Sequence, residues 1–154
     1  MHARAFVLFA FALAVVAASD RATADTSDPE RQAVAATVQL YFQGHATGSG
    51  EFFRKAMHPE GKMFWIKDGA LAQRPFPEYI AGAPGKPADD EARRVRRILM
   101  IDVTGDTAVA KVELAYPDAT LIDYLSLLRI DGKWMVINKI FHRSAPRPAV
   151  PSPR

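Results

Sequence analysis

The C-terminal part of the chain alternates apolar and polar residues with a period of two, and three turn signals divide it. The turns lie at residues 104–107, 116–119 and 131–132, and the last is an Asp-Gly dipeptide, which favours a tight hairpin. Four strands joined by such short turns predict an antiparallel meander that starts near Arg96. This pattern restricts the chain to folds that are built on one antiparallel sheet.

Helical spacing appears before the strands. Within residues 29–47, Val34, Val38 and Tyr41 recur at intervals of three and four. Asp28 or Ser27 can cap the N-terminus of this helix, and a glycine-containing segment after Thr47 ends it. Further expected elements are short helices at 51–57 and 76–81, a short strand at 62–67 and a loop at 82–87. Helices followed by a meander predict an α+β fold with the helices on one sheet face.

The N-terminus has the organisation of a signal peptide. A weakly basic start precedes an apolar run over residues 5–18, which is short for a membrane span. Small residues allow cleavage after Ser19 or after Ala24, and Ala24 is preferred because a polar segment follows it. An uncleaved membrane anchor is the alternative. The expected divisions are a signal peptide at 1–24, a domain at 25–143 and a proline-rich, extended or disordered tail at 144–154, in an exported, periplasmic or secreted protein.

Composition excludes several kinds of chemistry. The 154 residues include no cysteine, so disulfides, thiolate catalysis and cysteine-type zinc sites are ruled out. The net charge is +3, and the basic cluster at 93–97 lacks the interleaved aromatic residues of a nucleic-acid groove. No histidine pair has metal-motif spacing, and no glycine-rich phosphate loop is present. We therefore expect no metal, no cofactor, no nucleic acid and no membrane contact after signal removal.

A register count with two-residue turns separates the two faces of the predicted sheet. One face is almost wholly apolar and should meet the helices. Its polar exceptions are Arg97, Asp123, Asn138 and His142. The opposite face mixes apolar and charged residues, as protein interfaces often do, and predicts a homodimer. The residues counted to the helix side include Leu99, Ile101, Val103, Ala108, Ala110, Val112, Leu114, Leu121, Leu125, Leu127, Trp134, Val136 and Ile140; those counted to the dimer side include Ile122, Tyr124, Ile137, Lys139 and Phe141.

Two stretches resemble a known superfamily. The sequence YFQGHATG at 41–48, followed by AMHP at 56–59, resembles the first two helices of the nuclear transport factor 2-like superfamily. The ending, with DYLSLL at 123–128, DGKW at 131–134 and NKIFH at 138–142, is similar to the SnoaL-like group named "putative lumazine-binding". The resemblance implies a cone-shaped, cystatin-like fold with a pocket between the helices and a curved sheet. The superfamily hosts isomerases, dehydratases, cyclases and binding modules, so the fold alone does not assign a function.

The resemblance also implies a role for one helix residue. Tyr41 falls where the ketosteroid isomerases of this superfamily keep a tyrosine that donates a hydrogen bond to an oxyanion; the alternative is a core aromatic residue. The position of their carboxylate base falls near Trp65, and their second acid falls at Ser126. Both departures argue against steroid-isomerase chemistry.

Asp123 is the candidate catalytic residue. A carboxylate on a buried apolar face must be paired, hydrogen-bonded or protonated. It either exchanges protons or a hydrogen bond with a ligand, or it has a structural role in which it pairs with Arg97 or caps a buried network with Asn138 and His142. The aromatic residues supply walls for a planar ligand. The expected ligand-binding residues are Tyr41, Trp65, Tyr79, Arg97, Trp134, Asn138 and His142.

The sequence is compatible with three functions. The leading one is an exported small-molecule-binding domain whose ligand is a planar heterocycle. The second is an isomerase, dehydratase or cyclase that uses Asp123 in proton transfer. The third is a homodimeric interaction module without a ligand. The sequence does not identify the ligand, the reaction or a partner.

Overall fold

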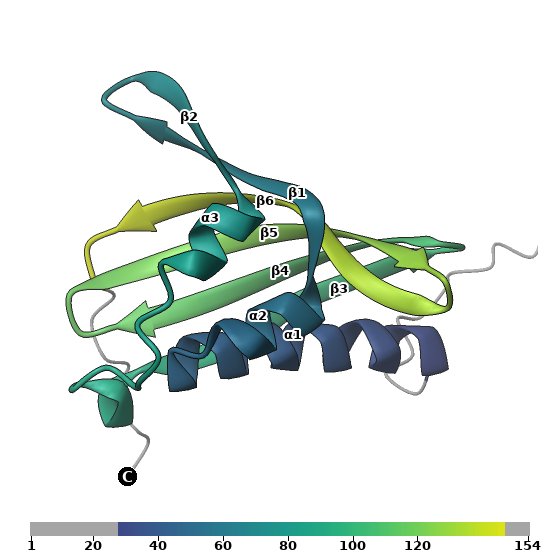
Figure 1. Ribbon diagram of the computed structural model, residues 1–154, viewed down its shortest axis with the longest axis horizontal. Helices are drawn as coiled ribbons and strands as arrows, with labels where there is room; N and C mark the ends of the chain where they lie inside the picture. Colours follow the sequence, from purple (N-terminus) through teal and green to yellow (C-terminus); the bar gives the residue numbers. More distant parts are fainter. Residues whose placement is uncertain (1–27, 147–154) are drawn as a thin grey trace, which may run out of the picture.

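The computed structural model describes residues 28–146. The expected signal peptide and all of the tail after Pro146 lie outside the described residues. Within the described part, the elements follow the predicted order of helices and then a meander, and the fold class is α+β as expected. Figure 1 shows the helices packed against a curved sheet that remains open at its edges.

The first helix, α1 (Pro29–Thr47), has the predicted bounds. The carboxylate of Asp28 accepts a hydrogen bond from the backbone N–H of Glu30 at 3.0 Å, and Pro29 occupies the first turn. Gly48 ends the helix with a positive φ of 67°, where a side chain would be strained. Val34, Val38 and Tyr41 are buried on the helix face that meets the sheet.

Three short helical segments follow. The helix α2 (Gly50–Ala56) starts one residue earlier and ends one residue earlier than expected, and α3 (Phe76–Ala81) has the expected bounds. A single 3-10 turn, η1 (Glu91–Arg93), precedes the meander. The loop between α3 and η1 is attached to α1, because the N–H of Gly85 donates to the carbonyl of Gly48 at 2.8 Å.

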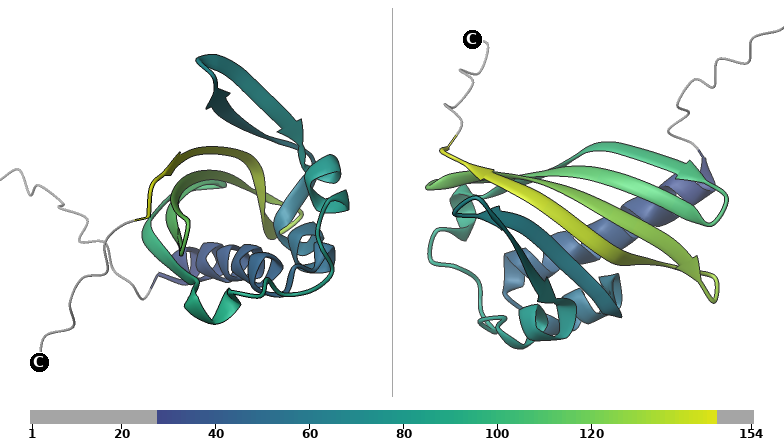
Figure 2. Two further views of the ribbon diagram at one scale, coloured as in Figure 1. Left: turned by 90° about the vertical axis from the view of Figure 1, so that its left-hand side faces the viewer. Right: turned by 90° about the horizontal axis from the view of Figure 1, so that it is seen from above.

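Six strands form one sheet in the order β2-β1-β6-β5-β4-β3. The four strands of the meander agree with the prediction, and β1 lies parallel to β6. The left view of Figure 2 shows the sheet curving over α1. The strands are β1 (Met57–Lys67), β2 (Ala70–Pro75), β3 (Val95–Thr104), β4 (Thr107–Tyr116), β5 (Ala119–Ile130) and β6 (Lys133–Ser144).

The strand β2 was not expected from the sequence. It pairs with β1 through a tight turn in which Asp68 and Gly69 both have positive φ, 52° and 79°. The resulting β1–β2 hairpin projects away from the rest of the sheet (Figures 1 and 2). Its pairing with β6 ends at Phe64 and Ile140, so the two strands diverge beyond that point.

A bulge in β6 changes which residues face the helices. Leu127 of β5 pairs with Val136, whereas Ser126 pairs with Asn138, so Ile137 is an extra residue in β6. Strand residues alternate between faces, and one extra residue reverses the alternation beyond it. The register count was therefore wrong for the rest of β6. Lys139 and Phe141 turn to the helix side, and the outer side receives Asn138, Ile140 and His142.

A second bulge affects β3. Val112 pairs with Ile98 and Lys111 pairs with Met100, which leaves Leu99 as the extra residue. Leu99 is 47% exposed, and Ile98 takes the expected place of Leu99 against the core. Ile101 and Ala110 lie in the core as predicted.

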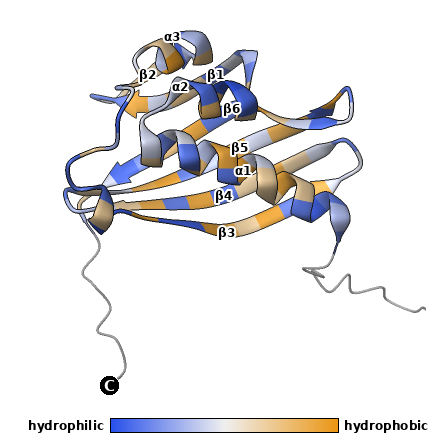
Figure 3. Ribbon diagram, turned by 60° about the horizontal axis from the view of Figure 1, so that its bottom comes forward, coloured by the Kyte–Doolittle hydropathy of each residue, from blue (hydrophilic) through white to orange (hydrophobic). Residues whose placement is uncertain are grey.

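The core lies between α1, α2, α3 and the concave face of the sheet. The hydropathy colouring of Figure 3 shows apolar and polar residues alternating along the strands. The convex face keeps large apolar side chains at its surface, among them Val95, Val109, Tyr124 and Ile140. Among the described helices, none is long and apolar enough to cross a membrane.

Candidate active site

Three side chains from three elements meet in the interior. The hydroxyl of Tyr41 on α1 donates to Oδ2 of Asp123 on β5 at 2.6 Å. Nζ of Lys139 on β6 donates to the same hydroxyl at 2.7 Å and lies 3.0 Å from Asp123 Oδ2. Tyr41 and Asp123 are fully buried, and Lys139 is 3% exposed. We call these three residues the buried triad.

Two properties of the buried triad suit it to proton transfer. Burial, and then the nearby charge of Asp123, raise the pKa of Tyr41 well above its usual value, so its hydroxyl stays protonated. Asp123 Oδ1 is buried and accepts no hydrogen bond from any residue in 28–146. A buried carboxylate oxygen without a donor is costly in a purely structural network. The same oxygen is open to accept a proton or a hydrogen bond from a ligand.

Aromatic rings surround the cation of the triad. Lys139 Nζ lies 4.7 Å from the ring centroid of Phe141, 5.4 Å from that of Tyr41 and 6.0 Å from that of Tyr79. Cation–π attraction is strongest where water is excluded. The rings therefore stabilise the positive charge while they keep the surroundings of Lys139 apolar.

His45 lies next to the triad, one helical turn after Tyr41. Its ring meets the Tyr41 ring edge-on at 4.7 Å. The Tyr79 hydroxyl is 3.4 Å from Nε2 and the Tyr116 hydroxyl is 3.3 Å from Nδ1. Burial, followed by the charges of Lys139, Arg96 and Arg94, holds the pKa of His45 well below its usual 6.5. The imidazole is thus neutral near pH 7, and one ring nitrogen donates while the other accepts.

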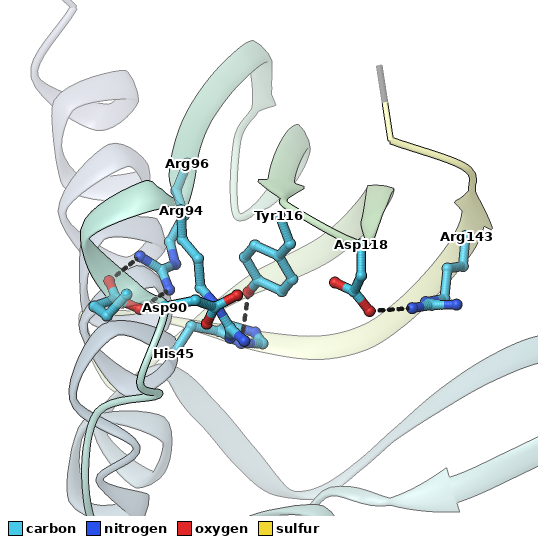
Figure 4. Close-up of polar contacts among 8 residues, drawn as sticks. His45, Asp90, Arg94, Arg96, Tyr116, Asp118 and Arg143 are labelled. Carbon is cyan, nitrogen blue, oxygen red and sulfur yellow. Dashed lines mark hydrogen bonds and ion pairs between the residues drawn. The ribbon is translucent and has the colours of Figure 1, made fainter. Parts of the chain in front are cut away.

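The network continues from His45 to the surface (Figure 4). The guanidinium groups of Arg94 and Arg96 lie 4.3 Å and 5.6 Å from the Tyr116 ring centroid. Arg94 pairs with Asp90 at 2.7 Å, and Arg96 makes two hydrogen bonds to Glu91 at 2.6 Å and 2.8 Å. The Arg96–Glu91 pair attaches η1 to β3, and both arginines lie over the ring of Tyr116. Figure 4 also shows Asp118 bound to Arg143 at 2.8 Å, which joins the turn before β5 to the end of β6.

A hollow of about 1180 Å³ lies in the fork between β1 and β6, the space that opens where the two strands diverge beyond Phe64 and Ile140. Its lining is mainly apolar and includes Phe64, Trp65, Ile66, Leu71, Tyr124 and Phe141. Trp65 and Phe141 stack with their ring centroids 5.5 Å apart. Phe141 therefore lines the hollow on one side and contacts Lys139 on the other. It separates an open volume that can hold a small organic molecule from the buried triad.

The structure brings together only part of the expected site. Tyr41 and Asp123 are in contact, Tyr79 packs beside them, and Trp65 lines the hollow. Trp134 lies near the start of α1, where its indole N–H donates to Glu30 at 2.9 Å. It is therefore not a wall of this site.

Three polar residues expected beside Asp123 are elsewhere. Arg97 lies opposite Glu113 on the outer face, where its Nη1 is 3.4 Å from the carboxylate. Asn138 and His142 are outward because of the bulge at Ile137. His142 still borders the hollow, on its outer side. The cation that pairs with Asp123 is Lys139, not Arg97.

Sequence reasoning missed Lys139 and His45. Lys139 was placed on the outer face, and the signal that could have located it is weak, because apolar residues occupy both faces of β6 at 136, 137, 140 and 141. For His45 a signal existed. It follows Tyr41 by four residues and so lies on the same helix face. Across residues 28–146, no three His, Asp or Glu side chains gather as metal ligands would.

A long helix on a curved six-stranded sheet is the cone-shaped α+β fold of the nuclear transport factor 2-like class. Residues 29–142 match the family described as "Putative lumazine-binding", and the chain belongs to this family.

Known proteins resemble this chain in sequence or in fold. The chain is 31% identical to the aldolase FrzH of Cladobotryum sp. over 121 residues, which is 77% of this chain and 94% of the relative. A nuclear transport factor 2-like protein of unknown function from Shewanella baltica OS155 superposes with a TM-score of 0.69 at 22% identity, covering 78% of this chain and 98% of that one. Another, from Methylobacillus flagellatus KT, has a TM-score of 0.67 at 27% identity and covers 79% and 97%.

Proposed function

We propose that this domain is an enzyme that transfers protons at the carbon next to a substrate carbonyl, in chemistry of the aldol type. The observation that carries the proposal is the buried triad, in which one carboxylate oxygen of Asp123 has no donor among the described residues. Removing a proton next to a carbonyl needs a base and a group that stabilises the developing enolate oxygen. The triad contains both.

Each residue has a role in this proposal. Asp123 accepts the proton from carbon through its open oxygen. Tyr41, whose raised pKa keeps the hydroxyl protonated, turns its single O–H from Asp123 Oδ2 to the enolate oxygen and donates a hydrogen bond to it. Lys139 supplies a positive charge beside the same oxygen, and the surrounding rings exclude water, which strengthens both interactions.

The relative named as an aldolase supports the aldol assignment. Forming or breaking a carbon–carbon bond beside a carbonyl passes through an enolate or its nitrogen equivalent, which needs the acid–base groups that the triad supplies. The similarity covers 94% of that relative, so it extends over nearly its whole length.

A binding module for a planar heterocycle is the second candidate. The stacked pair of Trp65 and Phe141 at the hollow favours it, because flat rings insert well beside other rings. The family description supports a small-molecule ligand in general terms. This candidate uses the hollow and leaves Asp123 Oδ1 without a role.

Deuterium exchange tests the enzyme proposal. The full chain is incubated in D₂O with hydroxyacetone or phenylacetone, and proton NMR follows the loss of signal at the carbon next to the carbonyl. The wild type should accelerate exchange above the buffer rate, and Asp123→Asn should lower the acceleration by about 100-fold or more. Asp102→Asn, at an exposed position of β3, is the matched control and should leave it unchanged.

Two results would count against the enzyme. The first is exchange at the buffer rate with both ketones. The second is equal exchange by the wild type and by folded Asp123→Asn, with folding checked by circular dichroism. Lumazine quenching of tryptophan fluorescence, abolished in Trp65→Ala, would then favour the binding module.

A further inference from the structure

Lys139 is an unusual residue for the inside of this sheet. The residues paired with it on the neighbouring strands, Leu125 of β5 and Met63 of β1, are apolar, and its side chain is 4% exposed. Lysine is rarely buried, and an ion pair inside a protein is often no more stabilising than apolar residues of the same size. A buried lysine beside a carboxylate and a phenol therefore calls for a chemical explanation.

We propose that Lys139 is a nucleophile that forms an iminium with an aldehyde or ketone substrate. The inference deepens the proposed function, on which it rests, because Lys139 then bonds to the substrate in addition to supplying a positive charge. Lysine amines in apolar pockets are established nucleophiles toward carbonyl compounds. The chemical class of substrate is an aldehyde or ketone with an apolar body, which suits the mainly apolar hollow lined by Phe141, the ring that also contacts Lys139.

The contacts of Nζ supply the proton acceptor that the reaction requires. Asp123 Oδ2 lies 3.0 Å from Nζ and takes one proton from the ammonium group, which leaves a neutral amine. The amine attacks the carbonyl carbon, and a C–N bond forms as the carbonyl oxygen takes the π electrons. The Tyr41 hydroxyl, 2.7 Å from Nζ, relays a proton from nitrogen to that oxygen to give a carbinolamine.

Loss of water completes the step. Asp123 returns its proton to the carbinolamine hydroxyl, water leaves, and the nitrogen lone pair forms the C=N bond of a positively charged iminium. Asp123 is again a carboxylate. The sum is one carbonyl compound and one ammonium group converted to one iminium and one water, with no oxidant or reductant. Asp123 Oδ1, which has no donor in the described part of the chain, then removes the proton from the neighbouring carbon.

The route to Lys139 passes Phe141. The Phe141 ring is both a wall of the hollow and a neighbour of Nζ, so rotation of this side chain is the movement that the proposal requires. Trp65, stacked on Phe141, is half-buried and lies toward the open end of the fork. In the proposal, a substrate that enters the hollow reaches Lys139 past the displaced Phe141 ring.

Reductive trapping tests the proposal. The full wild-type chain is incubated with phenylacetone or hydroxyacetone and sodium cyanoborohydride, which reduces an iminium to a stable amine, and is then digested with trypsin. A reduced adduct at Lys139 blocks cleavage there, so the peptide 134–143 should appear with the added mass. Lys111 on the outer face serves as the internal control, and we expect labelling of Lys139 to exceed that of Lys111 by about tenfold or more.

The outcomes separate this inference from the proposed function. Labelling concentrated at Lys139 and weakened in Asp123→Asn supports it. Equal labelling of Lys139 and Lys111, or normal cleavage after Lys139, overturns it. If the ketones still exchange deuterium without an adduct at Lys139, the nucleophile is refuted and the proposed function stands. An adduct at Lys139 without enzyme-dependent exchange would uphold the nucleophile and refute the proposed function.

Discussion

The hydroxyl of Tyr41 on α1 lies 2.6 Å from the carboxylate of Asp123 on β5, and the two residues are 82 positions apart in the sequence. This hydrogen bond joins the helix layer to the middle of the sheet in a region where both side chains are fully buried. Lys139 contacts both the Tyr41 hydroxyl and the Asp123 carboxylate. Its pair with Asp123 is the only buried ion pair between a lysine and an aspartate within residues 28–146. Fold stability and the proposed chemistry therefore depend on the same three side chains.

Removing the lysine charge should destabilise the fold. Lys139→Met leaves the Asp123 carboxylate buried without its cation, and we expect the free energy of unfolding to fall by about 3–5 kcal/mol. Urea denaturation followed by circular dichroism measures it. The double variant Lys139→Met/Asp123→Leu should recover most of the loss, because no buried charge then remains. Lys111→Met on the outer face is the control, and a loss in Lys139→Met no larger than in this control would refute the expectation.

Acid should destabilise the protein through His45. Its pKa in the folded protein is held well below 6.5, chiefly by burial, so the unfolded chain binds a proton that the folded chain does not. Stability is then full above about pH 6.5 and decreases as pH falls below it, by up to about 1.4 kcal/mol per pH unit. Urea denaturation between pH 7 and pH 5 measures the slope.

Two variants test whether His45 causes this slope. His45→Gln should flatten it, because the titrating group is gone, whereas His142→Gln, at an exposed position of β6, should leave it unchanged. An equal slope in wild type and folded His45→Gln would contradict the assignment.

Two copies of the chain should associate through the convex sheet face. This face exposes Tyr124 by 40% and Ile140 by 51%, and the correction at Ile137 adds Ile140 to it while removing Lys139 and Phe141. Apolar surface of this kind marks an interaction site. Sedimentation at about 100 µM should show a dimer that Ile140→Lys dissociates and Ile140→Val preserves. A monomeric wild type at that concentration would argue against the interface.

Export predicts a defined new N-terminus. Cleavage after Ala24 would give a chain that begins at Asp25, three residues before the capping Asp28 of α1. N-terminal sequencing of the protein from the periplasm or medium should read Asp25, or Asp20 if cleavage follows Ser19. An intact Met1 on the protein inside the cell would contradict export.

Much of the fold could be predicted from local signals. The cap at Asp28 and the glycine at Gly48 mark both ends of α1, and the meander follows from its turns. The missed strand β2 had such a signal as well, because Asp68-Gly69 is the same dipeptide as Asp131-Gly132, and both turns have positive φ. The composition of β2 explains why it was missed, because the strand is mostly exposed and its apolar and polar residues do not alternate.

The site was less predictable because it depends on one inserted residue. Period-two counting assumes an unbroken ladder, and the bulge at Ile137 reverses the face of everything after it in β6. Asp123, on the regular strand β5, was placed correctly. Lys139 was placed on the wrong face, because apolar residues on both sides of the bulge gave the count no means of detecting the shift.

We propose that the buried triad acts on a substrate and does not only hold the core together. Tyr41→Phe tests it most directly, because this change removes one hydroxyl and leaves the ion pair of Lys139 and Asp123 in place. We predict that ketone deuterium exchange falls by about 100- to 1,000-fold, while the free energy of unfolding falls by only about 1–3 kcal/mol. If folded Tyr41→Phe exchanges deuterium within about twofold of the wild-type rate, the loss is far smaller than removal of an oxyanion donor causes. That result would contradict a catalytic role for the triad.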